Sequence, residues 1–244
     1  MQSGTRIQKR RQIGLAVAAA FAAAALFAAQ GAQADTLSLN GWAVTTGSTP
    51  AFNLHNPNEG VYAGGFAGVY TSGASSTSFV AYCVDLSQTF NWGSAFAVTP
   101  ASASSVFTAT QYAALDHLYT QHFPATTDKA TSAAFQLAVW EIITETSGSY
   151  SLTAGPGQGS FWATPYGLAA TEGSALTTAN LWLGTVGTGA AGGYSLTVLQ
   201  SQSNQDQLIA TPIPEPETYA MLLAGLGLLG FAARRRKLKE AAAA

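Results

Sequence analysis

The pattern of apolar and polar positions predicts a β-rich domain with helices inserted in its middle. Short apolar or alternating runs bounded by Gly, Ser, Asn or Pro are typical of strands. We expect six strands, at Leu37 to Thr45, Val61 to Thr71, Ser78 to Phe90, Ser149 to Thr153, Tyr194 to Gln200 and Asp206 to Thr211. The polar stretch 71–78 is expected to be a loop or hairpin tip because it is rich in Gly, Ser and Thr.

Apolar residues in the middle of the chain recur every three or four positions, which is the period of a helix. One such run lies between a cap at Thr110 and a stop at Pro124. A second helix is expected to begin at Thr127 or Asp128 and to end near Gly148, and a third to end before Gly184. The fold class predicted is therefore α+β: β-sandwich-like antiparallel sheets with an inserted subdomain of about three helices.

Both ends of the chain differ from the domain between them. Residues 1–34 have a basic start, an apolar run and the small residues Ala32-Gln33-Ala34, which together are typical of a secretory signal peptide cleaved by signal peptidase. Near the C-terminus an uncharged run of 15 residues extends from Tyr219 to Ala233. As a helix it would be about 22 Å long, against a bilayer core of about 30 Å, and we expect it to span the inner membrane with help from flanking residues.

The residues that flank this run give it a direction. Pro214-Glu215-Pro216 precedes it, and Arg234, Arg235, Arg236 and Lys237 follow it. Basic residues prefer the cytoplasmic side, which places residues 238–244 inside as a cytoplasmic tail and the domain at residues 35–211 outside. The order of box, span and basic stop resembles the PEP-CTERM sorting signal of Gram-negative bacteria, at residues 212–237. The resemblance implies a substrate of the membrane protease exosortase.

Charge limits the partners of the domain. Residues 35–211 contain nine carboxylates and one strong base, Lys129, so the formal charge is −8. Phosphate binding needs clustered Lys and Arg, so nucleic acid is excluded as a partner.

The histidines His55, His117 and His122 are not spaced as metal ligands, and no cofactor is expected. Recognised catalytic motifs are missing as well, so we expect no enzyme.

Cys83 is the one cysteine in the chain. A lone thiol is unusual in an exported protein, where cysteines are normally paired or omitted. Gln136 is a second anomaly, because it shares one face of the second helix with Ala133, Trp140 and Ile143. An unpaired amide buried there would cost about 1–3 kcal/mol. Attack of the Cys83 thiolate on the Gln136 side-chain carbonyl, with loss of ammonia, would remove both anomalies and leave a thioester.

Alternatives to the thioester remain open. A free cysteine can be a small buried apolar residue, and a helix glutamine can be hydrogen-bonded to a neighbouring strand. An intermolecular disulfide through Cys83 is a third possibility. Asp85 lies close to Cys83, and Glu141 lies on the same predicted helix as Gln136. We expect Asp85 to be a carboxylate at the end of a strand and Glu141 to be a solvated helix residue, and neither to be catalytic. His117 is a candidate base.

The segments "YCVD" at 82–85 and "FQLAVWEI" at 135–142 are similar to the cysteine and glutamine segments of Cys-Gln thioester domains in bacterial surface adhesins. The resemblance implies Cys83 as thiol donor, Gln136 as acyl donor and Trp140 as packing partner. Tyr82 and Phe135 are further candidates for walls that exclude water.

These observations predict an exported cell-surface or extracellular-matrix protein that bonds covalently to a target. The targets expected are extracellular polysaccharide or surface amines. The alternative is a non-reactive matrix or biofilm protein in which Cys83 and Gln136 are simply buried.

Overall fold

The computed structural model describes residues 34–145, 148–153, 159–167, 170–214 and 221–231. The expected signal peptide therefore lies, except for Ala34, outside the described residues. The same holds for Glu215, Pro216 and the arginines at 234–236.

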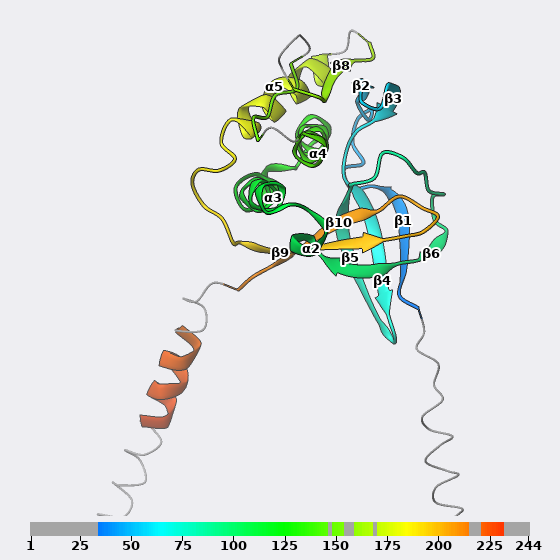
Figure 1. Ribbon diagram of the computed structural model, residues 1–244. Helices are drawn as coiled ribbons and strands as arrows, with labels where there is room; N and C mark the ends of the chain where they lie inside the picture. Colours follow the sequence, from blue (N-terminus) through cyan, green and yellow to red (C-terminus); the bar gives the residue numbers. More distant parts are fainter. Residues whose placement is uncertain (1–33, 146–147, 154–158, 168–169, 215–220, 232–244) are drawn as a thin grey trace, which may run out of the picture.

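The larger sheet has seven strands in the order β6-β1-β4-β5-β10-β9-β7, and each pair of neighbours is antiparallel. Its two edge strands are separated along the chain by the single residue Val98. The sheet therefore curls until it is nearly closed (Figure 1). Its strands are β1 (Thr36–Trp42), β4 (Phe66–Ser72), β5 (Ser75–Cys83), β6 (Ala95–Ala97), β7 (Thr99–Ser102), β9 (Tyr194–Gln200) and β10 (Gln207–Pro212).

A second, three-stranded sheet lies near the helices in Figure 1, in the order β3-β2-β8. Its strands are β2 (Ala51–His55), β3 (Glu59–Tyr62) and β8 (Trp162–Pro165). Strand β8 comes after α4 in the sequence, so this sheet joins the N-terminal part of the chain to the helical part.

Helix α4 (Lys129–Thr144) lies between α3 (Ala109–His122) and α5 (Ala170–Leu183) (Figure 1). It begins at a capping box formed by Asp128 and Thr131. Twelve of its 16 residues are buried, because α3, α5 and β5 surround it. The remaining helical pieces, α2 (Ala103–Val106) and η1 (Phe123–Ala125), are short.

The α+β prediction is confirmed: antiparallel sheets are combined with a helical insertion. The stretch 71–78 is the tip of the β4–β5 hairpin, in which Ser72 pairs with Ser75. The first of the long helices is capped by Thr108 rather than Thr110, and α4 ends at Thr144 rather than near Gly148.

Several strand predictions were wrong in extent. The run expected from Val61 to Thr71 is two strands, β3 and β4, in different sheets. It breaks at Gly64 and Gly65, where Gly64 has φ +155° and a Cβ on Gly65 would lie 2.9 Å from Val80 Cγ1. The strand expected from Ser78 to Phe90 ends at Cys83, and residues 149–153 form no strand. Strands β2, β6, β7 and β8 were missed.

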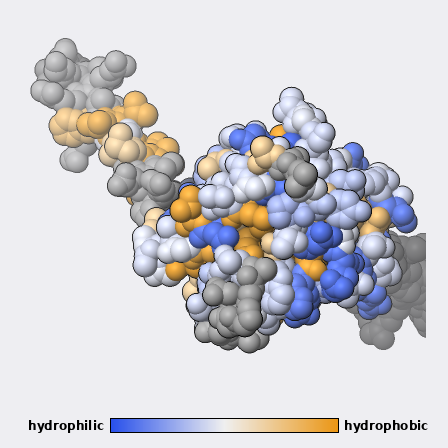
Figure 2. Space-filling view, turned by 90° about the horizontal axis from the view of Figure 1, so that it is seen from above, coloured by the Kyte–Doolittle hydropathy of each residue, from blue (hydrophilic) through white to orange (hydrophobic). Residues whose placement is uncertain are grey.

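Residues 221–231 form a helix in which every residue is exposed, and its apolar side chains are orange in Figure 2. Within the described ranges, no helix is both long enough and apolar enough to cross a membrane. The predicted span from Tyr219 to Ala233 includes residues at both ends that lie outside those ranges.

Candidate functional site

Cys83 is the last residue of β5 and pairs with Gln207 on β10. Its side chain is 1% exposed. The thiol Sγ donates a hydrogen bond to the carbonyl oxygen of Asp85, 3.1 Å away. The chain turns after Cys83, since the Asp85 carboxylate accepts a hydrogen bond from the Ser87 N–H at 2.8 Å. The thiol therefore lies where a central strand ends and a loop begins.

Gln136 projects from α4 onto the main chain of Cys83. Its Oε1 accepts a hydrogen bond from the Cys83 N–H at 2.9 Å, and its Nε2 donates one to the Cys83 carbonyl oxygen at 2.9 Å. Both bonds are buried, and Gln136 is 1% exposed. These two hydrogen bonds pair the Gln136 amide with the main chain of Cys83 in the way that a residue of a neighbouring strand would pair with it. It also fixes the side-chain carbonyl of Gln136 beside the residue that carries the thiol.

The thiol of Cys83 is held in its neutral form. Burial raises its pKa to about 12, and the charges of Asp85 and Asp206 act in the same direction. The hydrogen bond to the Asp85 main chain and the indole of Trp140 lower the pKa, but by less. The free thiol is therefore protonated throughout the physiological pH range.

Trp140 lies one helical turn after Gln136 on α4 and is 3% exposed. Its Nε1 is buried and finds no acceptor with hydrogen-bond geometry in the described part of the chain. The indole nonetheless lies close enough to the sulfur to lower the pKa of the thiol. Trp140 thus presents an unused N–H donor on the side of the thiol.

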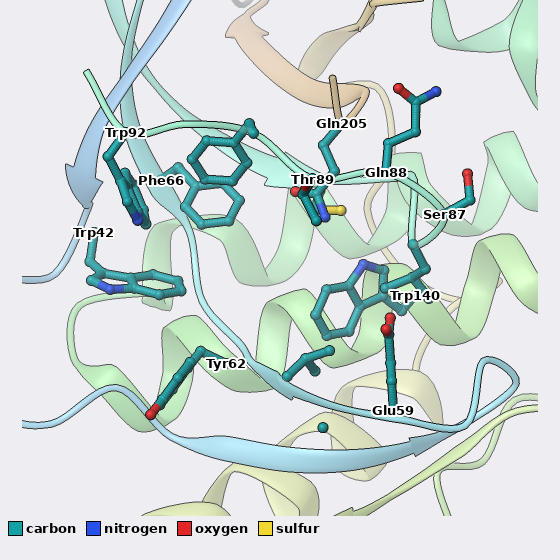
Figure 3. Close-up of a pocket in the computed structure, with 15 residues that line it drawn as sticks. Trp42, Glu59, Tyr62, Phe66, Ser87, Gln88, Thr89, Trp92, Trp140 and Gln205 are labelled. Carbon is teal, nitrogen blue, oxygen red and sulfur yellow. The ribbon is translucent and has the colours of Figure 1, made fainter. Parts of the chain in front are cut away.

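A cavity of about 430 Å³ opens beside Cys83 and Trp140 (Figure 3). Loop residues after β5 form one of its sides, and residues of β1, β3 and β4 form others. It is lined by Trp42, Glu59, Gly60, Val61, Tyr62, Phe66, Cys83, Leu86, Ser87, Gln88, Thr89, Phe90, Trp92, Trp140 and Gln205.

Tyr82 and Phe135 do not line this cavity, although the sequence suggested both as walls. Neighbouring residues of a strand point to opposite faces, so Tyr82 points away from the side chain of Cys83. Tyr82 packs against Phe135 with ring centroids 4.6 Å apart, and both rings contact Tyr119. They belong to an aromatic core between β5 and the helices.

Glu141 was expected to be solvated, and this was wrong. Its side chain is 0% exposed, and its Oε1 accepts a hydrogen bond from the Ser151 N–H at 2.7 Å. Burial, with a smaller contribution from the charge of Glu145, raises its pKa to about 8, although the hydrogen bond from Ser151 acts in the opposite direction. The all-round burial of α4 causes this, because the helix has no solvated face at that position.

The histidines lie apart from one another and are absent from the lining of the cavity. His55 stacks on Trp162 with ring centroids 3.5 Å apart, and His122 stacks on Trp182. His117, the candidate base, faces the carbonyl oxygen of Ala190 at 3.2 Å. Across the described ranges, no three His, Cys, Asp or Glu side chains form a group that could hold a metal ion.

Sequence reasoning missed the aromatic side of the cavity. Trp42, Phe66, Phe90 and Trp92 come from three separate segments, and their ring centroids lie 4.8–5.5 Å apart in successive pairs. The run "TFNWG" at 89–93 was a local signal, because two aromatics close together follow a strand there. The contribution of Trp42 depends on pairing between β1 and β4, which is not a local property.

Comparison with known proteins identifies the C-terminal segment. Residues 212–237 match the PEP-CTERM protein-sorting motif. The motif is that of an exported protein sorted by exosortase. No curated protein sequence matches the chain.

The solved structures that resemble the chain include the following two. One is the N-terminal domain of the Streptococcus pyogenes pilus tip adhesin Cpa, with 15% identity and a TM-score of 0.41 over 71% of this chain and 99% of that one. The other is the N-terminal thioester domain of a surface protein from Clostridium perfringens, with 14% identity and a TM-score of 0.37 over 61% of this chain and 89% of that one. Similarity this low carries no argument about chemistry, which has to rest on the residues of this chain.

Proposed function

We propose that Cys83 and Gln136 form an internal thioester through which this exported protein bonds covalently to a target on another surface. The observation that carries the proposal is the double hydrogen bond between the Gln136 amide and the main chain of Cys83. It supports the proposal because the Gln136 side-chain carbonyl is held against the main chain of the residue that carries the thiol, and both residues are 1% exposed.

In the first step the sulfur of Cys83 attacks the side-chain carbonyl carbon of Gln136. The C–N bond breaks, ammonia leaves with the thiol proton, and a C–S bond remains. Negative charge develops on Oε1 of Gln136 during the attack, and the Cys83 N–H already points at this atom from 2.9 Å. A preorganised donor at this distance is what stabilises an oxyanion.

In the second step an amine or hydroxyl of the target attacks the same carbon. Its oxygen or nitrogen becomes bonded to the Gln136 acyl group, the C–S bond breaks, and the proton of the nucleophile ends on the sulfur. Burial opposes the release of a thiolate, since it raises the pKa of Cys83 to about 12. The indole of Trp140 acts in the opposite direction and eases this release.

The second candidate function is that of a non-reactive matrix or biofilm component. One observation favours it: both polar groups of the Gln136 amide already have partners, so no unpaired amide needs to be removed. In that case the two residues only connect α4 to the end of β5.

Intact-mass spectrometry of the secreted domain separates the two candidates. We expect the wild type to be lighter than its sequence by one ammonia, and methylamine to convert it to an adduct. Cys83→Ala is the matched control, because alanine keeps the main-chain N–H and C=O that bind Gln136 and loses the sulfur alone. A wild type of full mass whose thiol reacts with iodoacetamide after unfolding would refute the thioester.

A further inference from the structure

The cavity beside Cys83 has a continuous aromatic wall that reaches the surface. Trp92 contacts Trp42 at 5.5 Å and Phe90 at 4.8 Å between ring centroids. Trp92 is 47% exposed and Tyr62 is 65% exposed, and both line the cavity (Figure 3). Single exposed aromatics need no explanation, but several gathered around one cavity indicate a binding site.

Two buried polar atoms of residues that line the cavity have no partner within the described residues. Trp140 is 3% exposed, and its indole Nε1 has no hydrogen-bond partner within the described residues. The Oε1 of Gln205 is likewise buried and, among those residues, unpaired. Buried polar groups normally have partners, so one unused donor and one unused acceptor at the same cavity indicate a missing ligand with hydroxyl groups.

The charge of the walls disfavours both an anionic and a cationic ligand, although Lys129 Nζ lies 5.3 Å from the centroid of the Trp42 ring. No Lys, Arg or His is among the described residues that line the cavity, and the whole domain has a formal charge of −8. Glu59 is the one carboxylate in the lining, and it is exposed. A solvated carboxylate adds little to the binding of a cation. The aromatic rings also pack edge-on against one another and do not enclose a central point as a cation cage would.

We propose that this cavity binds a neutral saccharide. The C–H face of a sugar ring is apolar and carries slight positive charge, so it packs on the negative face of an aromatic ring such as that of Trp92 or Tyr62. Sugar hydroxyls both donate and accept, so they match the indole N–H of Trp140, the Oε1 of Gln205 and the side chains of Ser87, Gln88 and Thr89. A volume of about 430 Å³ lies within the usual range for small ligands.

If the cavity binds a saccharide, a sugar hydroxyl is the nucleophile that attacks the thioester. This second step of the inference rests on the proposed thioester. Cys83 is among the lining residues, so a hydroxyl of the bound sugar approaches the thioester from the sulfur side. Its oxygen attacks the acyl carbon of Gln136, an ester bond forms, the C–S bond breaks, and the hydroxyl proton ends on the sulfur of Cys83. The adduct is then an ester between Gln136 and the sugar.

Non-covalent binding is tested first, in Cys83→Ala, where no thioester can form. The probes are cellohexaose, mannohexaose and chitohexaose, measured by isothermal titration calorimetry. We expect at least one of them to bind, and Trp92→Ala in the same background to weaken it by at least tenfold. Leu181→Ala is the matched control, because Leu181 is 67% exposed on α5 and is absent from the cavity lining. It should leave the affinity unchanged.

Two further variants keep the test decisive if Trp92→Ala does not fold. Tyr62→Ala removes an exposed ring, and Gln205→Ala removes an unpaired acceptor, and each should weaken binding at least threefold. Binding of none of the three sugars, or equal loss in Leu181→Ala, would overturn the proposal. So would binding of spermidine in place of all three sugars, which would assign the cavity to cations.

The failure of this proposal can be told apart from failure of the thioester. A mass deficit of one ammonia without sugar binding leaves the thioester and removes the saccharide site. Sugar binding by Cys83→Ala together with a wild type of full mass leaves the saccharide site and removes the ester. If both hold, the wild type incubated with the bound sugar should gain its mass as an ester that hydroxylamine cleaves.

Discussion

Glu141 is a carboxylic acid in a fully buried position, next to the segment that carries Gln136. Its Oε1 accepts a hydrogen bond from Ser151, and Glu145 and Tyr150 are the titratable groups near it. Because burial raises its pKa to about 8, the folded protein holds a proton there that the unfolded chain releases near pH 4.5. The contribution of Glu141 to folding stability is therefore greatest below about pH 4.5, falls as the pH rises towards about 8, and does not fall further above that.

Glu141→Gln tests this linkage, since glutamine resembles the protonated acid and can still accept the Ser151 hydrogen bond. We expect the Tm of the wild type to fall between pH 5 and pH 8 relative to that of the variant, by at least about 2–4 °C, which corresponds to about 1 kcal/mol. Asp206, whose pKa is also raised by burial, adds a slope of the same sign to both proteins. Parallel Tm curves measured by circular dichroism would contradict the prediction.

At the scale of elements, the junction between β3 and β4 sets the position of α4. The Gly65 N–H donates a hydrogen bond to the Ser132 hydroxyl on α4 at 2.9 Å. A Cβ on Gly65 would lie 2.9 Å from Val80 Cγ1 and 3.0 Å from the Tyr82 ring. The close approach of these two neighbours on β5 leaves no room for a side chain, so glycine is needed here on steric grounds.

Gly65→Ala should lower the free energy of unfolding by about 1–3 kcal/mol, because it overpacks a fully buried contact. Gly41→Ala is the matched control: Gly41 lies on β1, and a Cβ there would meet nothing within 4 Å. Urea denaturation of the two variants measures the difference. Equal midpoints would show that the β3–β4 junction tolerates a side chain and does not fix α4.

At the scale of the whole molecule, the sorting motif begins where the last strand ends. The motif covers residues 212–237, and β10 ends at Pro212. Ile213 still contributes one main-chain hydrogen bond, to the Gly193 carbonyl oxygen at 2.9 Å. Main-chain hydrogen bonding in the described part of the chain therefore extends to Ile213, and we expect the domain to be complete at about Pro214.

A chain that stops after Pro214 should fold with an unchanged Tm and lose exosortase-dependent sorting. The reason is that, among the described residues, no main-chain hydrogen bond to the domain is found beyond Ile213. Cell fractionation in hosts with and without exosortase measures the sorting, and differential scanning calorimetry measures the Tm. A second truncation after Thr211 is the control, since it removes the end of β10 and should lower the Tm. An unchanged Tm after both truncations would contradict the assignment of the boundary.

Local features of the sequence predicted a signal peptide and determined the sorting motif and the kinds of elements, because these depend on residues that are close along the chain. They also marked Cys83 and Gln136, since a lone thiol and an amide on an apolar helix face are anomalies of composition and period. Only the tertiary structure decided that Gln136 binds the main chain of Cys83, 53 residues away. Likewise, only the tertiary structure shows that Glu141 is buried, that Tyr82 points away from the thiol, and that Trp42, Phe66 and Trp92 line the same cavity. Those outcomes depend on which strands pair and on how α4 is enclosed, and no short stretch of sequence contains that information.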